Sequence, residues 1–313
     1  MDYYIFNGDA DGIIATRIFS GINGGKNKFI TGVKRDISLL KQVEHLQNQT
    51  ISVFDIAIEK NLMALEKLLK NNCIIKWFDH HISNDIPNNR NFKPVLNTDP
   101  KVNTTWLVSN YQKKFTPWTV AGLFGDNMTK TALNIGQIID LNNEQIELLK
   151  DFGELLNYNS YGEKLADLFF PPVEILKRTY DFTDIFDLID QTDIYEILSE
   201  GRDKDLKKAR NAEIIAPGVI RFPNEAWAKR VIGIYANGIS NREPEMAHAV
   251  LVENKEMDFV VSVRSAINQE KNVAEFCSLF PTGGGRMKAG GINKLPKRKL
   301  ESFLAAFHLY FNQ

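Results

Sequence analysis

Short apolar runs alternate with amphipathic segments over the first eighty residues of the chain. The apolar runs, which have the length of buried strands, cover residues 3–6, 28–33, 51–55 and 73–78. The segments with helical spacing of apolar positions cover residues 12–19, 37–46 and 61–69. Repeated strand–helix–strand units predict an α/β fold with a doubly wound, mostly parallel sheet, in which ligands bind beyond the carboxyl ends of the strands.

The pattern changes in the second half of the chain. From about residue 129 to residue 199 it is helical, with a helix expected at 142–156 and a turn-rich interruption at 157–162. Residues 201–210 are the most charged stretch, which indicates a linker or an exposed helix, and we place a domain boundary there. Beyond it we expect strands at 218–222, 247–252 and 258–264 and a helix at 226–235. The chain should therefore form two domains, residues 1–200 and a smaller α/β domain of residues 201–313.

The composition, with 43% hydrophobic and 25% charged residues, is that of a globular protein. The longest apolar runs are shorter than the roughly 18 residues of a membrane-spanning helix, and the first residues lack the features of a signal peptide. We therefore expect a soluble, cytoplasmic protein with no membrane partner. Cys73 and Cys277 lack the paired spacing of a metal site and are expected to be buried thiols.

Charge differs between the two predicted domains. Residues 1–200 contain 20 Lys and Arg against 27 Asp and Glu, a net charge of −7, whereas residues 201–313 contain 18 against 12, a net charge of +6. Chance variation with solvated helix faces is one explanation, and a cation-binding half beside an anion-binding half is the other. The total charge of −1 favours short or small phosphorylated substrates over a long nucleic-acid track.

Acidic side chains and histidines gather where predicted strands end. These residues are Asp9, Asp11, Asp55, Asp79, His80, His81 and, further along the chain, Asp126. Taken singly, an Asp after a strand is commonly a helix N-cap and a His pair on a loop is commonly exposed. Because the ends of parallel strands meet at one edge of the sheet, however, these carboxylates should share a crevice, where they would repel one another without a cation.

Carboxylate oxygens with one imidazole suit Mn²⁺ or Mg²⁺ better than zinc. Two such ions about 4 Å apart clamp the attacking and leaving oxygens of a phosphate ester and lower the pKa of a bound water. Asp55, which closes a strand near the middle of the site, is the expected bridging ligand. In the Asp79-His80-His81 run we expect one histidine to bind metal, the aspartate to fix its tautomer, and the other histidine to face the phosphate.

The sequence resembles the DHH phosphoesterase superfamily, including its RecJ and nanoRNase branches. The resemblance lies in four motifs that occur in this order: Asp-x-Asp-Gly, an isolated strand-end Asp, Asp-His-His and a further Asp. The C-terminal half agrees, since residues 261–265 (Val-Ser-Val-Arg-Ser) and 283–291 (Gly-Gly-Gly-Arg-Met-Lys-Ala-Gly-Gly) resemble the DHH-associated nucleotide-binding domain. The resemblance covers nearly the whole chain.

The resemblance implies a role for each matching position. It makes Asp9, Asp11, Asp55, His80 and Asp126 metal ligands, supported by Asp79 and His81 as catalytic residues. It places Arg264 and Ser265 at a substrate phosphate, together with Arg286 and a turn formed by Gly283, Gly284 and Gly285. Glycines without side chains let backbone N–H groups approach a substrate, and Arg offers a planar fork to phosphate oxygens.

Two positions depart from the family pattern. Asn7 stands where the RecJ branch has an acidic residue, and the histidine that precedes the motif in the nanoRNase branch is replaced by Ile5. Asn7 offers a neutral carbonyl oxygen to a metal, so one of the two ions should bind more weakly. Arg286 stands where the family's glycine turn usually ends in His, and it keeps a phosphate donor without the ability to shuttle protons.

The leading hypothesis is a Mn²⁺-dependent phosphoesterase that uses two ions, with Mg²⁺ as the alternative metal, and hydrolyses short oligonucleotides or nucleotides in a cleft between the two domains. A RecJ-like exonuclease specific for single strands is the second interpretation. The third is a nucleotide-binding protein that has lost turnover through Asn7 and Arg286. The sequence leaves open whether the protein is a homodimer.

Overall fold

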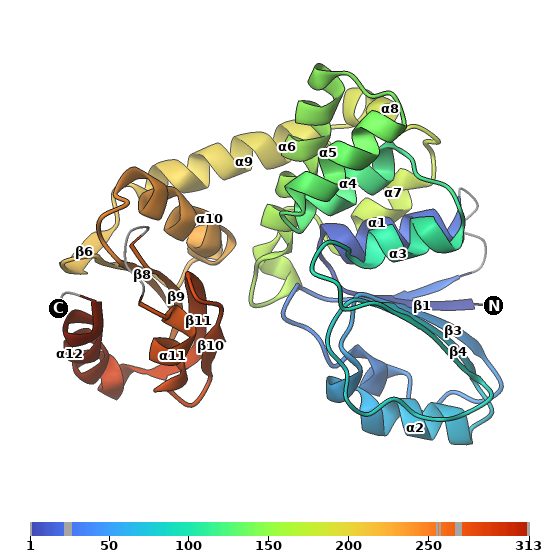
Figure 1. Cartoon of the computed structure of the whole chain (residues 1–313), viewed down its shortest axis with the longest axis horizontal. Coiled ribbons are helices and arrows are strands. Elements are labelled where there is room, and N and C mark those ends of the chain that lie inside the picture. The colour runs from blue at the N-terminus through green and yellow to red at the C-terminus, as the bar shows by residue number, and fades with distance from the viewer. Residues whose placement is uncertain (1, 22–26, 255, 257, 267–270, 312–313) are drawn as a thin grey trace. The chain divides into compact units, whose positions relative to one another are not determined.

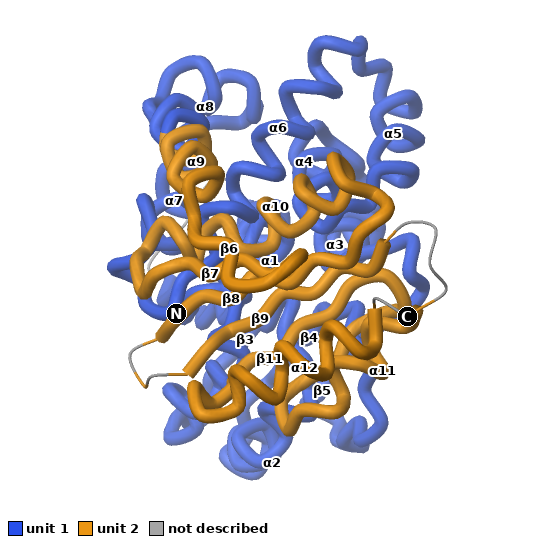
Figure 2. Tube along the Cα trace, turned by 90° about the vertical axis from the view of Figure 1, so that its left-hand side faces the viewer, with its two compact units in different colours: residues 1–200 blue, residues 201–313 orange. Residues whose placement is uncertain are grey.

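The computed structural model describes residues 2–21, 27–254, 256, 258–266 and 271–311. Its residues group into two units, 1–200 and 201–313 (Figures 1 and 2). The division falls inside helix α9 (Ile194–Ala209), so the charged stretch at 201–210 is largely the second half of a helix.

Unit 1 contains a five-stranded sheet of order β2-β1-β3-β4-β5 in which every neighbouring pair is parallel. The strands are β1 (Asp2–Phe6), β2 (Lys28–Ile30), β3 (Thr50–Phe54), β4 (Ile74–Asp79) and β5 (Phe92–Leu96). This confirms the predicted parallel α/β sheet. The strand order reverses between β1 and β3, and in doubly wound sheets ligands bind outside the carboxyl ends of the strands at that point.

Helices cover both faces of this sheet (Figure 1). Helices α1 (Ala10–Ser20) and α3 (Thr104–Tyr111) lie on one face, and α2 (Leu62–Lys70) lies on the other. The alternation of side chains along β1 explains how the strand serves both layers. Tyr3 and Ile5 belong to the core that also holds the apolar residues of α2, whereas the ring of Tyr4 packs against Phe19 of α1.

One predicted helix is wrong. Residues 37–46 contain only the short 3₁₀ turn η1 (Leu39–Gln42). The amide of Asn61 explains this difference, because its Nδ2 donates to the Ile37 carbonyl and its Oδ1 accepts from the Leu40 N–H. A side chain from another segment thus satisfies backbone groups that would otherwise pair along a helix.

The remaining helices of unit 1 follow β5, and the turn expected at 157–162 begins only after residue 160. These helices are α4 (Pro117–Gly125), α5 (Thr129–Ile138), α6 (Asn143–Ser160), α7 (Pro172–Thr179) and α8 (Ile185–Gln191), followed by α9. The 3₁₀ turn η3 (Leu165–Asp167) lies between α6 and α7, and the turn η2 (Ile58–Lys60) precedes α2. Tyr158 and Asn159 are fully buried, so tertiary contacts stabilise the helical conformation of this end of α6 although its residues favour turns. None of the described helices is long and apolar enough to cross a membrane.

Unit 2 is built on a six-stranded mixed sheet of order β10-β11-β9-β8-β7-β6, in which only β7 and β8 are parallel neighbours. Its strands are β6 (Glu213–Ala216), β7 (Val219–Phe222), β8 (His248–Glu253), β9 (Asp258–Arg264), β10 (Gly283–Gly285) and β11 (Ala289–Pro296). Its helices are α10 (Ala226–Arg242), α11 (Val273–Ser278) and α12 (Leu300–Phe311), with the 3₁₀ turn η4 (Lys297–Lys299). The apolar core around Phe276, Phe303 and Phe307 is confined to this unit.

Candidate metal centre

The loop from β1 to α1 places Asp9 and Asp11 at the start of a helix. Asp9 is the N-cap of α1, and its Oδ1 accepts the Gly12 N–H at 3.1 Å. Glycine is required at position 12, because a Cβ there would lie 2.2 Å from the carbonyl oxygen of Asn7. The sharp turn therefore depends on the Asp-x-Asp-Gly pattern and buries both carboxylates.

Asp11 points away from its own helix and holds the start of α3. Its Oδ2 accepts the Thr104 N–H at 2.9 Å, and its Oδ1 accepts the Thr105 N–H at 2.6 Å. These N–H groups belong to the first turn of α3, where no intrahelical partner exists and the helix dipole favours a negative charge. Asp11 thus joins two helices through a fully buried carboxylate.

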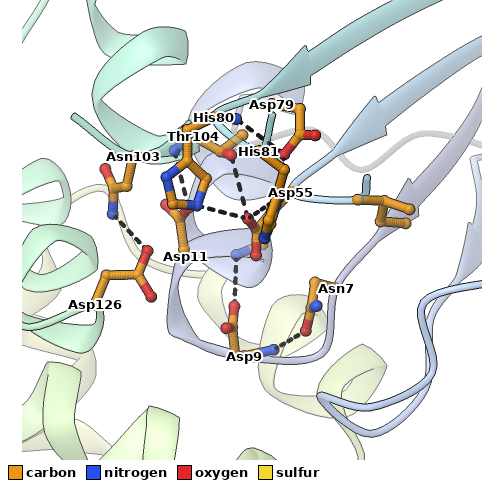
Figure 3. A network of polar contacts seen from close by, with 12 residues as sticks. Asn7, Asp9, Asp11, Asp55, Asp79, His80, His81, Asn103, Thr104 and Asp126 are labelled. Atoms are coloured by element: carbon orange, nitrogen blue, oxygen red, sulfur yellow. Dashed lines mark hydrogen bonds and ion pairs between the residues drawn. The ribbon is translucent and has the colours of Figure 1, made fainter. Parts of the chain in front are cut away.

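Asp55 follows the last residue of β3 with a φ of 57°. A left-handed backbone is uncommon for a residue other than glycine, and buried examples concentrate at functional sites. Its carboxylate Oδ1 lies 3.4 Å from Nε2 of His80 and accepts a hydrogen bond of 3.4 Å from the hydroxyl of Thr104. Figure 3 shows Asp55 between the histidines and Asp9.

The Asp79-His80-His81 run closes β4, the next strand in the sheet. Nδ1 of His81 lies 2.7 Å from Oδ1 of Asp79, which also accepts the backbone N–H of His80. Asp79 was expected to orient the histidine that binds metal. In the structure its side chain forms a hydrogen bond with the ring of His81 and not with the ring of His80. The His81 side chain is 46% exposed while Asp79 is fully buried, so a buried carboxylate orients a ring that solvent can reach.

Asp126 reaches the same region from the end of α4. Its Oδ2 accepts a hydrogen bond of 3.4 Å from Nδ2 of Asn103, which also donates to the Gly122 carbonyl. Figure 3 shows Asp126 and Asp11 on the side of His80 nearest Asn103. The C-terminal end of α4 thus supplies the carboxylate that is most distant along the chain from the β1 loop.

The carboxylates carry an electrostatic cost that shows in their pKa values. Burial first, and then the charges of Asp55 and Asp126, hold the pKa of Asp11 well above its usual range. Burial and the charge of Asp9 raise the pKa of Asp55 to about 6 and also raise the pKa of Asp126. Burial opposes a charge on His80, but the contact with Asp55 and the surrounding carboxylates raise its pKa to about 10.

Two overlapping groups of side chains present ligand atoms within 4.8 Å of one another. Asp11, His80 and Asp126 form one, and Asp55, His80 and His81 form the other. These oxygen and imidazole donors fit a hard divalent cation, and a positive ion would relieve the repulsion that raises the carboxylate pKa values. Asp9 belongs to neither group.

Asp9 pairs instead with Lys34, a residue that the sequence analysis missed. Nζ of Lys34 lies 2.6 Å from Oδ2 of Asp9. Burial alone would raise the pKa of Asp9, but the ammonium lowers it. Asn7, the further candidate ligand, uses its Oδ1 to accept the Asp9 N–H and its Nδ2 to donate to the Lys34 carbonyl.

Lys34, Asn103 and Thr104 are site residues without a metal-ligand signature in the sequence. Lys34 comes shortly after the second predicted strand, so the rule that pointed to Asp9 and Asp55 would also have found it. Asn103 is the N-cap of α3, where its side chain accepts the Trp106 N–H. A search for strand-end residues of every charge, together with helix caps, would have located Lys34 and Asn103, but not Thr104, which is the first residue of α3.

No protein-family model and no curated protein matches the sequence. Among solved structures, a DHH-domain protein described as a member of a family of ribosomal proteins aligns over 98% of this chain and 85% of its own, with a TM-score of 0.64 and 14% identity. The exonuclease RecJ bound to manganese aligns over 100% and 90%, with a TM-score of 0.60 and 15% identity. The chain has the DHH fold.

A third match to the DHH fold is the pGpG-specific phosphodiesterase PggH from Vibrio cholerae. It aligns over 100% of this chain and 99% of its own, with a TM-score of 0.54 and 11% identity. The three alignments each include both units of this chain, so the DHH resemblance of the sequence extends to the fold of the whole chain.

In this DHH fold, the residues predicted to bind substrate lie at the end of β9 and along β10, two strands of unit 2 that are separated by β11. Arg264 ends β9, where its Nε donates to Asn237 at 2.6 Å and its Nη1 donates to Ser262 and to the Val263 carbonyl. The hydroxyl of Ser265 is buried and has no hydrogen-bond partner among the described residues.

The glycines at 283–285 were expected in a turn, and that prediction is wrong. They form strand β10, which pairs with β11 so that Gly284 lies opposite Gly291 and Gly285 opposite Gly290. The turn comes after them, where the exposed Arg286 donates its backbone N–H to the Ala289 carbonyl at 2.7 Å. Helix α11 covers part of this hairpin, since a Cβ at Gly283 would lie 1.7 Å from the Cys277 carbonyl oxygen, whereas a Cβ at Gly284 would meet no described heavy atom within 4 Å.

Proposed function

We propose that the protein is a phosphoesterase that depends on a divalent metal and hydrolyses short oligonucleotides or nucleotides. The observation that carries this proposal is the cluster of Asp11, Asp55 and Asp126 around His80, in which Asp11 and Asp55 are buried and each carboxylate pKa is raised. A cluster of this kind is unfavourable by itself, so its presence beside the strand ends of a DHH fold supports a cation site.

Each residue of the cluster has a role in this proposal. Asp11, His80 and Asp126 hold the metal, Asp55 lies between them and the second histidine, and Mn²⁺ or Mg²⁺ suits their donor set. The bound ion supplies positive charge at the phosphate and makes water more acidic. His81, oriented by Asp79, holds a proton near the leaving oxygen, because its pKa is raised and its ring is exposed.

Unit 2 supplies the residues that we propose for substrate binding. These are the guanidinium of Arg264, the hydroxyl of Ser265, the exposed Arg286 and the backbone of β10 at Gly284, where a side chain would meet no described atom within 4 Å. Together they suit a phosphate and its sugar. The net charge of −1 favours a short substrate over a long polymer. A location between the two domains, a homodimer and the cytoplasm all stay predictions.

The test is release of phosphate or mononucleotide from a small panel of substrates. The panel contains a 5-mer RNA, a 24-mer single-stranded DNA, linear pGpG, a cyclic dinucleotide and 3′-phosphoadenosine 5′-phosphate, each with Mn²⁺, with Mg²⁺ and with chelator. We expect hydrolysis of a short member that chelator abolishes and that the Asp55→Ala variant lacks while its circular dichroism is unchanged. Hydrolysis that persists in chelator would contradict the proposal, and a preference for the 24-mer DNA would favour a RecJ-like exonuclease.

A nucleotide-binding protein without turnover is a second candidate. The observation that favours it is the pairing of Asp9 with Lys34, which occupies a carboxylate that the family resemblance assigns to metal binding. This candidate predicts tight nucleotide binding with no hydrolysis of any panel member in either metal. The same panel, combined with calorimetric titration of each nucleotide, therefore separates the two functions.

A further inference from the structure

Lys34 is anchored in the candidate metal centre by both its side chain and its backbone. Its ammonium donates to Oδ2 of Asp9 at 2.6 Å and to Oδ1 of Asn157 at 2.9 Å, and lies 5.4 Å from the ring centre of Tyr161. Its backbone N–H donates to the Ser160 carbonyl at 3.0 Å. The last turn of α6 therefore holds the lysine, in the place where a helix dipole favours a positive charge.

Asn7 completes this arrangement in a way that an aspartate would not. Its Nδ2 donates to the carbonyl of Lys34, and its Oδ1 accepts the N–H of Asp9. An amide offers a donor and an acceptor together, whereas a carboxylate would turn a second acceptor toward the Lys34 carbonyl. The asparagine at position 7, where the RecJ branch has an acidic residue, is therefore hydrogen-bonded to the residue that supplies the ammonium, Lys34.

The ammonium of Lys34 supplies part of the positive charge that the buried carboxylates require. Asp9, Asp11, Asp55 and Asp126 are buried or nearly so, and Lys34 already compensates one of them. A single divalent ion then brings the formal charge of these five side chains from −3 to −1. Asp9 and Asn7, which the family resemblance offers as metal ligands, are instead hydrogen-bonded to Lys34.

We propose that this protein binds one divalent ion per chain, at Asp11, His80 and Asp126, and that the Lys34 ammonium takes the place of the second ion. An ammonium has three N–H donors, and two of them go to Asp9 and Asn157. Among the described residues no further hydrogen-bond acceptor lies at Nζ, so the third donor serves a phosphate oxygen of the substrate. The inference rests on the proposed metal site and names its stoichiometry.

The experiment measures Mn²⁺ stoichiometry on metal-free protein without substrate, by calorimetric titration and by electron paramagnetic resonance. We expect one Mn²⁺ per chain and a spectrum without spin coupling between ions. The Asn7→Asp variant should still bind one, because Lys34 remains, and the double variant Asn7→Asp with Lys34→Ala should bind two ions whose spectra are coupled. Lys41→Ala, which changes an exposed lysine, is the matched control and should bind one.

Two results would overturn the inference. One is a wild-type chain that binds two coupled Mn²⁺ ions, and the other is a double variant that keeps its thermal unfolding transition but binds a single ion. If the double variant does not fold, the wild-type stoichiometry decides by itself. Because no substrate is present, the outcome is independent of hydrolysis: a chain with one ion and no turnover contradicts only the proposed function.

Discussion

Nδ1 of His81 lies 2.7 Å from Oδ1 of Asp79, and this bond links an exposed ring to a fully buried carboxylate. The same oxygen accepts the His80 N–H, so one side chain fixes the backbone of the first histidine and the ring of the second. The hydrogen bond to Asp79 is the main reason that the pKa of His81 is raised.

Replacing Asp79 with Asn should lower the pKa of His81, because the amide removes the negative charge that favours the protonated ring. We expect the histidine NMR titration of His81 to move to lower pH and the rate of hydrolysis to fall by about 10²-fold, the lower end for a general acid or base. His45, which is exposed and distant in sequence, is the internal control in the same spectra. An unchanged His81 titration would show that Asp79 does not support the ring's charge.

Metal binding should release protons. In the metal-free protein the pKa of His80 is about 10 and that of Asp55 about 6, so at pH 7 the imidazole is charged and competes with a cation. A metal binds neutral imidazole and ionised carboxylate, and its affinity should therefore rise with pH from about 6 toward 10. Calorimetric titration of Mn²⁺ in two buffers of different ionisation enthalpy measures the protons released.

The pKa values of both Asp55 and His80 are raised in the folded protein, and this direction determines how stability changes with pH. A raised pKa means that the folded, metal-free protein retains the proton to higher pH than the unfolded chain. The stabilisation that comes from this bound proton is therefore lost as pH rises through the pKa of the folded state. Metal-free protein should accordingly lose stability as pH increases from about 4 to 6 through Asp55, and Mn²⁺ should restore it. Proton uptake on metal binding would contradict the prediction.

Asp126 offers the cleanest test of a metal ligand by thermal unfolding. Among the described residues its side chain accepts only the long hydrogen bond from Asn103, so Asp126→Asn should change the metal-free melting temperature little. Mn²⁺ at 100 times its Kd should raise the melting temperature of the wild type by about 5–10 °C, from about 2.7 kcal/mol of binding free energy. The variant should lose this rise.

Asp140→Asn is the matched control for that experiment. Asp140 is exposed and has a φ of 57°, a conformation that Asn adopts readily, so the substitution should leave both the fold and the Mn²⁺ effect intact. An Asp126→Asn variant that keeps the full rise in melting temperature would exclude Asp126 from the metal site.

The sequence predicts unit 1 well where local pattern and tertiary structure agree. Strands β1, β3 and β4 are buried apolar runs, and a parallel sheet brings their carboxyl ends together whatever lies between them. That is why Asp11, Asp55 and His80 could be expected to meet, whereas Asp126 comes from the end of helix α4 and was expected there on the order of the family motifs. The paired spacing of Asp9 and Asp11 could not show that their carboxylates point to different partners, one to Lys34 and one to the start of α3.

Other features depend on contacts that no local pattern contains. The segment at 37–46 has helical spacing, but the side chain of Asn61 satisfies its backbone groups from a distance of more than twenty residues. Strand β5 was not predicted, because it contains Pro94 and proline usually argues against a strand. Proline is tolerated here because β5 lies at the edge of its sheet. The glycine run was expected in a turn because glycine usually marks one, whereas pairing with β11 extends it into a strand.

Two neighbouring glycines of β10 should respond differently to the addition of a methyl group. A Cβ at Gly283 would lie 1.7 Å from the carbonyl oxygen of Cys277, whereas a Cβ at Gly284 would have no described heavy atom within 4 Å. Gly283→Ala should therefore destabilise the protein by about 3 kcal/mol, the cost of forcing a packed backbone apart. Gly284→Ala should leave the free energy of unfolding within about 1 kcal/mol of the wild type, since glycine costs roughly that much in a strand.

The pair separates a structural role of the glycines from a role in binding. If the backbone of β10 at Gly284 approaches a substrate, Gly284→Ala should weaken the binding of a non-hydrolysable nucleotide by blocking that approach, while denaturant unfolding stays nearly unchanged. Gly233→Ala, at another glycine whose Cβ would meet nothing within 4 Å, controls for the added methyl group and should bind as the wild type does. Equal nucleotide affinity in the Gly284→Ala and Gly233→Ala variants would remove β10 from the binding surface and leave Arg264 as the residue to test next.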